Sequence, residues 1–268
     1  MKIPKSHPRY ESLMRREELV RAWKAGIVVP EGLIAHGRGE AFDYLLGETT
    51  SAPALVAERA AAAFLLRARR PMISVNGNVA ALATREVVGL ANIVSAGIEV
   101  NLFHRTETRV RRIVRKLRAA GATNVLGRDP DARIPGLESR RALSSQKGVF
   151  GADVVVVPLE DGDRTEALVR MGKTVISIDL NPLSRTSQRA TIPVVDELTR
   201  ALPNMERFAR DLQSDPGEIA RLIKTYRKSE NMKALFAFLD WRLRGLREVP
   251  KVVRGASPRP RRIRSTKD

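Results

Sequence analysis

The chain has 268 residues, with 48 Lys and Arg against 30 Asp and Glu, which gives a formal net charge of +18 at pH 7. Cysteine is absent and there are three histidines, so disulfides and thiolate chemistry are excluded and a His-built zinc site has little support. No apolar run approaches the roughly 20 residues of a membrane span, and no signal-peptide core begins the chain, so we expect a cytoplasmic protein.

The positive charge is densest near the C-terminus, in a segment rich in Pro, Gly and Ser. We expect residues 251–268 to form a disordered basic tail and residues 1–250 to form a single α/β domain with helical additions at both ends. A basic nucleic-acid-binding protein is one interpretation of this charge, but an aromatic content of 4% supplies few stacking residues. A positive field equally suits an enzyme whose substrates are polyanions.

Helical patterns cover about residues 9–24 and 53–69, and the unusual segment 34–44 lies between them. It places His36, Arg38 and Glu40 among glycines, a mixture for which a hydrophobic core has no use. Glycine permits a positive φ or a close approach to a ligand, and a guanidinium matches phosphate or carboxylate. We therefore predict a ligand loop here, with a simple polar turn as the alternative.

From residue 72 onward, apolar runs of strand length alternate with helical patterns, which predicts a Rossmann-like, mostly parallel sheet with helices on both faces. The predicted strands are residues 72–75, 98–103, 124–126, 154–157, 174–178 and 192–195. The predicted helices are about 84–96, 107–120, 163–171, one beginning at Glu197, 216–227 and 231–246.

Three details of this pattern are open to test. Asp163 and Glu166 have the spacing of a capping box for the helix that follows, and Asp196 is placed to cap the helix beginning at Glu197. Residues 128–148 lack periodicity, which predicts a long loop at the site or at a contact with a second subunit.

Polar clusters follow four of the predicted strands, at residues 74–78, 101–107, 160–166 and 179–185. In parallel sheets ligands bind beyond the carboxyl ends of the strands, so these clusters should form one site. Asp179 is placed to accept a hydrogen bond from a ribose hydroxyl or an adenine amino group, with Asn181 beside it. Neither a Walker A motif nor GxGxxG is present, which disfavours a P-loop kinase and an ordinary NAD dehydrogenase.

Together with residues 3–10, these clusters closely resemble archaeal 4-phosphopantoate–β-alanine ligases, also called phosphopantothenate synthetases. The resemblance runs from about residue 3 to about residue 215 and is most specific over residues 155–171 and 176–185. It implies an ATP-dependent ligase that forms 4′-phosphopantothenate for coenzyme A synthesis, with AMP and diphosphate released through an acyl-adenylate. It further implies Mg²⁺, small-molecule substrates and a cytoplasmic homodimer, with no membrane or specific nucleic-acid partner.

The resemblance also implies which residues bind ATP. They are Arg16, Arg38, Asp179, Leu180, Asn181, Arg185, Thr186, Glu197 and Leu198. Glu197 and Leu198 would act mainly through main-chain N–H groups at a helix start.

The 4-phosphopantoate candidates are Asn76, Asn78, Arg105 and Arg164, because each follows a predicted strand and a guanidinium can bind phosphate or carboxylate bidentately. A solvent-facing position in the first helical turn is the alternative for Arg164.

Glu40 and His36 are the candidate catalytic residues. Glu40, Glu160, Asp161 and Asp163 are the carboxylates available for Mg²⁺ or for deprotonating the β-alanine ammonium, and the metal ligands stay unassigned.

Composition and periodicity alone indicate only an α/β protein with anion-binding loops. A Rossmann-like oxidoreductase, or a nucleotide-dependent enzyme of other chemistry, is therefore the alternative enzyme hypothesis. Two features depart from the family pattern: Ser139, where a His is common, and the basic tail.

Overall fold

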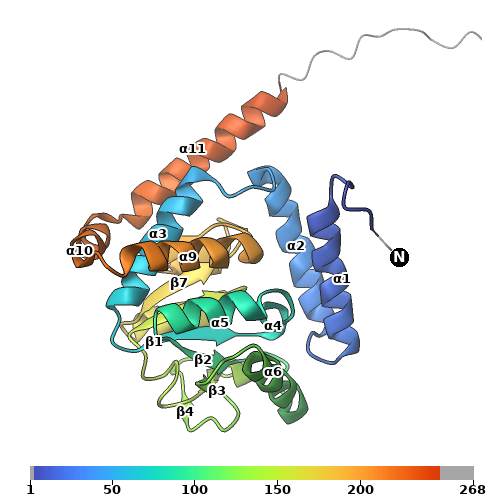
Figure 1. The fold of residues 1–268 in the computed structure, drawn as a ribbon, viewed down its shortest axis with the longest axis vertical. Helices are drawn as coiled ribbons and strands as arrows, with labels where there is room; N and C mark the ends of the chain where they lie inside the picture. Colours follow the sequence, from blue (N-terminus) through green and yellow to red (C-terminus); the bar gives the residue numbers. More distant parts are fainter. Residues whose placement is uncertain (1–2, 248–268) are drawn as a thin grey trace, which may run out of the picture.

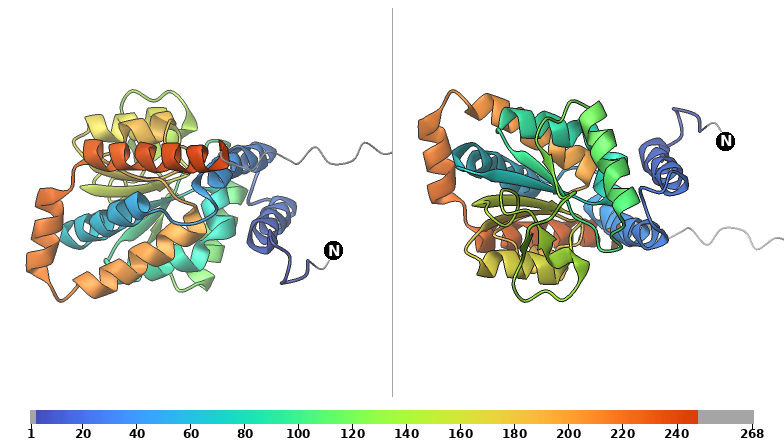
Figure 2. Two further views of the ribbon diagram at one scale, coloured as in Figure 1. Left: turned by 90° about the horizontal axis from the view of Figure 1, so that it is seen from above. Right: turned by 90° about the horizontal axis from the view of Figure 1, so that it is seen from below.

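The computed structural model describes residues 3–247, in which helices cover both faces of a central sheet (Figures 1 and 2). The six strands have the order β3-β2-β1-β6-β7-β8 and pair in parallel throughout. They are β1 Pro71–Val75, β2 Gly97–Val100, β3 Val125–Leu126, β6 Val154–Pro158, β7 Thr174–Ile178 and β8 Ile192–Val194. The predicted Rossmann-like parallel sheet is confirmed.

Burial of both faces explains why the central strands are continuous apolar runs. Val154 and Val156 pack into the core beneath one helical layer, and Val155 and Val157 pack into the core on the opposite face. The first layer contains α3 Ala52–Arg67, α5 Thr84–Ile93, α6 Glu107–Ala119 and α9 Leu198–Leu212; the second contains α7 Gly162–Arg170 and α8 Arg185–Arg189.

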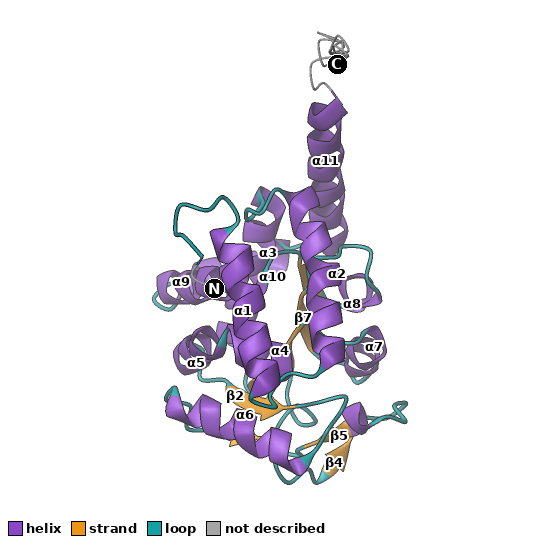
Figure 3. Cartoon of the chain, turned by 90° about the vertical axis from the view of Figure 1, so that its right-hand side faces the viewer, coloured by secondary structure: helices purple, strands orange, loops and turns teal. Residues whose placement is uncertain are grey.

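Helix α4 Gly77–Leu82 follows directly after β1, where the sequence predicts only a turn, and four further helices complete the helical part of the described chain. They are α1 Tyr10–Lys24, α2 Pro30–Leu46, α10 Pro216–Thr225 and α11 Lys228–Arg247. The first two stand side by side at one edge of the molecule, and α11 contacts both α2 and α3 (Figures 1 and 3). None of the helices in residues 3–247 is long and apolar enough to cross a membrane.

The predicted glycine loop at residues 34–44 is wrong, because this segment forms the middle of helix α2. Pro30 occupies the first turn, and Gly47 ends the helix in the left-handed region at φ 87°. Gly37 and Gly39 adopt ordinary helical geometry, so they are not needed for a turn. A Cβ on Gly37 would meet no atom within 4 Å, and a Cβ on Gly39 would lie 3.8 Å from a methyl carbon of Leu180, so close packing does not require either glycine.

Both predicted helix caps are displaced. Helix α7 begins at Gly162 after Asp161, and Asp163 lies inside its first turn, where its carboxylate accepts from the Arg164 N–H. Helix α9 begins at Leu198, and the Glu197 carboxylate accepts from the Thr199 N–H at 2.6 Å. Asp196 instead accepts from the Glu197 N–H at 2.8 Å, one residue before the helix starts.

Residues 128–148 are more ordered than a loop. They contain the antiparallel pair β4 Ala132–Arg133 and β5 Leu143–Ser144, joined through a 3-10 turn at Arg140–Ala142. Buried Glu99 on β2 holds the returning strand, because its carboxylate accepts from the Ser144 hydroxyl and the Ser145 N–H. The expected basic tail, residues 251–268, lies outside the described residues.

Candidate active site

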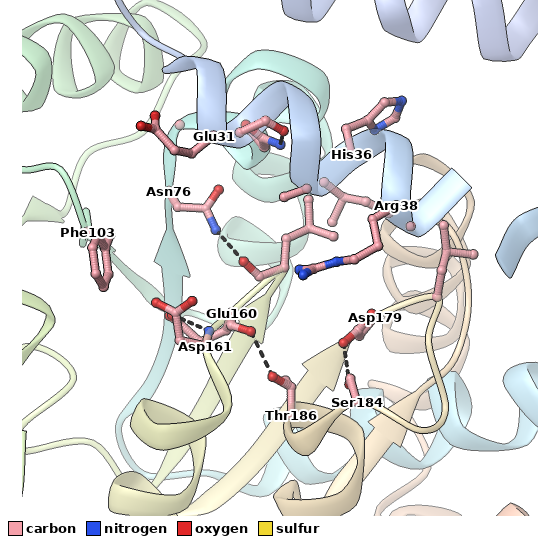
Figure 4. A pocket seen from close by; sticks show the side chains of 18 of the residues that line it. Glu31, His36, Arg38, Asn76, Phe103, Glu160, Asp161, Asp179, Ser184 and Thr186 are labelled. Atoms are coloured by element: carbon pink, nitrogen blue, oxygen red, sulfur yellow. Dashed lines mark hydrogen bonds between the residues drawn. The ribbon is translucent and has the colours of Figure 1, made fainter. Parts of the chain in front are cut away.

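A cavity of about 680 Å³ lies between helix α2 and the carboxyl ends of the parallel strands (Figure 4). The turns after β1, β2, β6 and β7 all contribute to it, together with the start of α9. The strand order reverses between β1 and β6, and ligands of open α/β sheets bind at such a reversal. The four polar clusters therefore meet at one site, as the sequence predicts.

Helix α2 covers the cavity with both small and large residues. Gly32, Ala35 and Gly39 line it, and a Cβ on Gly32 would lie 2.4 Å from the Asn78 carboxamide oxygen. Arg38 reaches from this helix into the cavity (Figure 4). Gly32, which lies outside the wrongly predicted loop, thus allows the start of α2 to approach the turn after β1 closely.

The end of the cavity around Asp179 contains nearly all of the residues that the resemblance implies for ATP, and it is called here the nucleotide end after that expectation. The residues on its lining are Arg38, Asp179, Leu180, Asn181, Arg185, Thr186, Glu197 and Leu198. Arg16 is not among the lining residues and instead donates to Glu40 from α1.

Asp179 organises the turn after β7. Its carboxylate accepts from the Asn181 N–H at 3.0 Å and from the Ser184 hydroxyl. Burial raises the pKa of Asp179, while the bonds from Ser184 and Asn181 act in the opposite direction. Asp179 is therefore part of the turn's own framework as well as a cavity wall (Figure 4).

Other polar groups at the nucleotide end are also partly engaged. Arg185 donates to Glu166 at 2.6 Å, and Thr186 donates to the Glu160 carbonyl at 2.7 Å. The Glu197 N–H donates to Asp196, so it is not available to a ligand as the sequence interpretation supposed. Of the two main-chain N–H groups predicted to bind ATP, those of Glu197 and Leu198, the Leu198 N–H is therefore the one that remains for a ligand.

The second end of the cavity, called here the acid end, contains Asn76 and Asn78. The Asn76 amide donates to the Leu159 carbonyl at 2.9 Å, which joins the turn after β1 to the turn after β6 (Figure 4). The Asn78 amide donates to the Gly32 carbonyl at 2.8 Å, which ties the same turn to α2. Both side chains therefore fix the walls of the cavity.

The structure does not bring Arg105 or Arg164 to the cavity lining. Arg105 donates to the carbonyls of Gly127 and Arg128 at 2.6 and 3.0 Å. Arg164 is 0% exposed and donates to the Ser74 hydroxyl at 3.0 Å and to Glu160. A solvent-facing Arg164 is therefore wrong as well, because the first turn of α7 points its guanidinium into the protein.

Arg141, which the sequence interpretation missed, takes a place on the lining. It pairs with Glu160 and with Asp161 at 2.8 Å, and it donates to the Asn101 carbonyl at 3.0 Å. Burial lowers its pKa, but the charges of Glu160 and Asp161 outweigh this and raise the pKa overall. No sequence signal marks Arg141, because the segment around it has no periodicity.

Arg109 is a second lining residue that the sequence interpretation missed. It lies in the first turn of α6 and donates to the carbonyls of Ile27 and His104. Burial lowers its pKa, and Glu31 acts in the opposite direction.

The two candidate catalytic residues lie on the side of α2 that faces α1. Glu40 is absent from the lining and accepts from Arg16 at 2.6 and 2.9 Å. Burial acts to raise the pKa of Glu40, but the hydrogen bond and charge of Arg16 lower it overall. His36 belongs to the lining, but its ring points away from the strand ends (Figure 4), and burial lowers its pKa.

The four carboxylates proposed for Mg²⁺ or proton transfer have different surroundings. Both oxygens of Glu160 are held by arginines, and Glu40 is held by Arg16. Asp163 is not on the lining, whereas Asp161 lines the cavity, is 46% exposed at its side chain and has one oxygen bound to Arg141. Within residues 3–247 no group of three His, Asp or Glu side chains is placed to hold a metal by itself.

Comparisons with known proteins agree with this geometry. A family model described as phosphopantothenate/pantothenate synthetase matches residues 53–241. The chain is 60% identical over 225 residues to a Methanosarcina mazei protein named 4-phosphopantoate–β-alanine ligase, covering 84% of this chain and 88% of that protein. It is 52% identical over 250 residues to a Thermococcus onnurineus protein of the same name, covering 92% and 96%. The chain therefore belongs to the phosphopantothenate/pantothenate synthetase family.

Proposed function

We propose that this protein joins 4-phosphopantoate to β-alanine at the expense of ATP, forming 4′-phosphopantothenate in coenzyme A synthesis. The observation that carries the proposal is a single cavity whose two ends each present an arginine, Arg38 and Arg109, without an ion-pair partner in the described chain. Two anionic substrates must meet in such a reaction. The names of the similar archaeal proteins specify the same substrates.

The proposed chemistry needs no protein nucleophile. A carboxylate oxygen of 4-phosphopantoate attacks the α-phosphorus of ATP, and diphosphate leaves. The β-alanine amine, after losing a proton, attacks the acyl carbon of the resulting acyl-adenylate, and AMP leaves as the amide forms. The protein's contribution is to hold three substrates in line and to offset their negative charge.

Asp161 is the carboxylate best placed to hold the β-alanine ammonium. It lines the cavity beside Glu160 (Figure 4), its side chain is 46% exposed, and Arg141 occupies one of its oxygens. Substitution by Asn should raise the KM for β-alanine more than the KM for ATP, because only the amine substrate carries a positive charge. Glu40 is better supported as a residue that positions Arg16 on α1 than as a base.

Mg²⁺ is proposed as an ion that arrives with ATP. Mg²⁺ in proteins commonly takes one or two carboxylates and completes its shell with phosphate oxygens and water. The exposed Glu31 is the lining carboxylate that fits this role, because arginines hold Glu160 and Asp161 is assigned to the β-alanine ammonium. When bound, the ion would neutralise phosphate charge.

We also propose a cytoplasmic homodimer. Leu183, Trp241 and Leu246 expose 67%, 67% and 59% of their surface, and the helix carrying the last two contacts α2. A second copy covering this apolar surface would remove it from water. Light scattering on the purified protein distinguishes the dimer from a monomer.

One assay tests the proposed activity. Purified protein is incubated with ATP, Mg²⁺, 4-phosphopantoate and β-alanine, each substrate is omitted in turn, and AMP and ADP are separated. AMP that requires both the acid and the amine supports the proposal. ADP as the nucleotide product would replace the acyl-adenylate by an acyl phosphate, and no turnover with either pantoate derivative would remove the proposed function.

A further inference from the structure

Arg109 lies at the acid end of the cavity, where the sequence interpretation had expected Arg105 and Arg164. The hydroxyl of Thr106 caps α6 by accepting from the Arg109 N–H at 3.2 Å, which places Arg109 in the first helical turn. Asn78 and His104 also line the cavity, and the His104 carbonyl accepts from Arg109. Arg109 therefore reaches the carboxyl ends of the strands from helix α6 and not from one of the turns that follow the strands.

Main-chain carbonyls hold the guanidinium of Arg109 in place. Its Nε and Nη2 donate to the Ile27 carbonyl at 3.2 and 2.9 Å, and its Nη1 donates to the His104 carbonyl. These bonds use three of the five N–H donors of an arginine, so two donors on the terminal nitrogens are left over. A Cβ on Gly77 would lie 2.9 Å from Nη2, so a glycine at this position leaves room for the guanidinium.

The charge of Arg109 has no carboxylate partner within residues 3–247. The neighbouring arginines differ in this respect, because Arg141 pairs with Glu160 and Arg185 pairs with Glu166. Glu31, the acid whose charge acts on Arg109, lies 3.8 Å from His104 instead. A partly buried cation without a counter-charge, fixed in position and with donors to spare, is an incomplete ion pair that an anionic ligand would complete.

The two arginines without ion-pair partners on the lining belong to opposite ends of the cavity. Arg38 comes from α2 and acts electrostatically on Asp179, at the nucleotide end (Figure 4). Arg109 contacts His104, the residue after Phe103, which Figure 4 shows at the other end of the cavity. One cation is therefore available to each of two phosphorylated ligands.

We propose that Arg109 binds the phosphate of 4-phosphopantoate and makes the enzyme distinguish this substrate from pantoate. The inference rests on the proposed function and adds the residue that recognises the phosphate. Pantoate would leave the guanidinium without a partner, and a site built to bind a polar group rejects analogues that lack it. The carbonyl bonds fix the direction of the fork, so a lysine at this position would keep the charge and lose the geometry.

The test is a set of binding measurements on the full chain by titration calorimetry. Arg109→Met, Arg109→Lys and a control, Arg111→Met, are each titrated separately with 4-phosphopantoate, pantoate and ATP. Arg111 lies on the same helix, is 53% exposed and pairs with Glu107, so its loss should leave all three affinities unchanged. Melting temperatures show whether each variant is folded.

We expect Arg109→Met to bind 4-phosphopantoate about 100-fold more weakly than the wild type, with pantoate and ATP affinities changed less than about threefold. The affinity of Arg109→Lys for 4-phosphopantoate should lie between those of the wild type and Arg109→Met. An unchanged ratio of 4-phosphopantoate to pantoate affinity would overturn the inference, and so would an equal loss for both acids, since that indicates a structural role. If Arg109→Met does not fold, the ratio in Arg109→Lys decides.

Failure of this inference is distinguishable from failure of the proposed function. Wild-type turnover of 4-phosphopantoate, β-alanine and ATP tests the function without reference to Arg109. A wild-type enzyme that turns over these substrates, combined with variants of unchanged selectivity, overturns the role of Arg109 alone.

Discussion

Glu58 on α3 faces Asp196, the residue two positions before α9, and both side chains are buried. Burial and the charge of Asp196 raise the pKa of Glu58 to about 9. Asp196 itself accepts from Thr50 and pairs with Arg200. A protonated Glu58 can donate to Asp196, whereas the side chain of Asn204 acts in the opposite direction on the pKa of Glu58. The carboxyl groups of Glu58 and Asp196, next to the start of α9, therefore form a pair in which Glu58 holds a proton at neutral pH.

This pair predicts a pH-dependent stability. The folded pKa of about 9 is above the ordinary value of 4.5, so the folded state holds more protons between these two values and its stability falls as pH rises through that window. Glu58→Gln keeps a neutral donor and removes the titration. We expect the melting temperature of the wild type to fall more between pH 5 and pH 9 than that of Glu58→Gln, measured by thermal unfolding in matched buffers with about 0.1 M salt. Parallel pH profiles would contradict a shared proton.

Arg38→Ala should weaken ATP binding without affecting the fold. Arg38 is an exposed residue of α2 that reaches into the cavity and has no ion-pair partner in residues 3–247. Losing a hydrogen bond to a charged partner costs about 1.5–3 kcal/mol, which is roughly a tenfold to hundredfold change in affinity. Equilibrium binding of ATP measures it, with exposed Arg118→Ala on α6 as the matched control. An unchanged ATP affinity would place the nucleotide elsewhere.

Glu40→Gln separates positioning from catalysis. Glu40 accepts two hydrogen bonds from Arg16 and so holds this arginine in position. The hydrogen bond and charge of Arg16 outweigh burial and lower the pKa of Glu40, which makes Glu40 a weak base. We expect a several-fold rise in the KM for ATP with little change in kcat. Loss of a general base would instead lower kcat by about 10²–10⁴. Steady-state kinetics decide between the two, and Glu17→Gln, at an exposed position of α1, is the control.

Deletion of the basic C-terminal segment should leave the enzyme active. The family match ends at residue 241, and the cavity residues lie between Val29 and Leu198. We expect truncation after residue 250 to change kcat/KM and melting temperature little and to reduce any salt-sensitive DNA binding. Activity assays and fluorescence anisotropy at two salt concentrations measure the two effects. Joint loss of activity and folding would show that the segment packs on the rest of the protein.

The sequence determined the sheet and the location of the site, because both follow from local patterns. Uninterrupted β-branched runs such as residues 154–157 are typical of strands buried on both faces, and parallel strands bring their carboxyl ends to one edge. The polar clusters at those ends therefore had to meet. Helix α2 was missed because glycine is unfavourable in isolated helices. In the folded protein, Gly32 of this helix permits close packing against Asn78.

Only the tertiary structure decided which charges face the cavity. Arg105, Arg109, Arg141 and Arg164 have equivalent side chains, and a sequence pattern does not specify which of them meets a carboxylate or a carbonyl. Folding pairs Arg164 and Arg141 with Glu160, and turns Arg105 toward Gly127. Arg109 lines the cavity without an ion-pair partner in the described chain, and Ile27 and Gly77, both distant from it in sequence, lie against its guanidinium. Such long-range pairing has no local signature, so residue identity alone could not separate a binding arginine from a structural one.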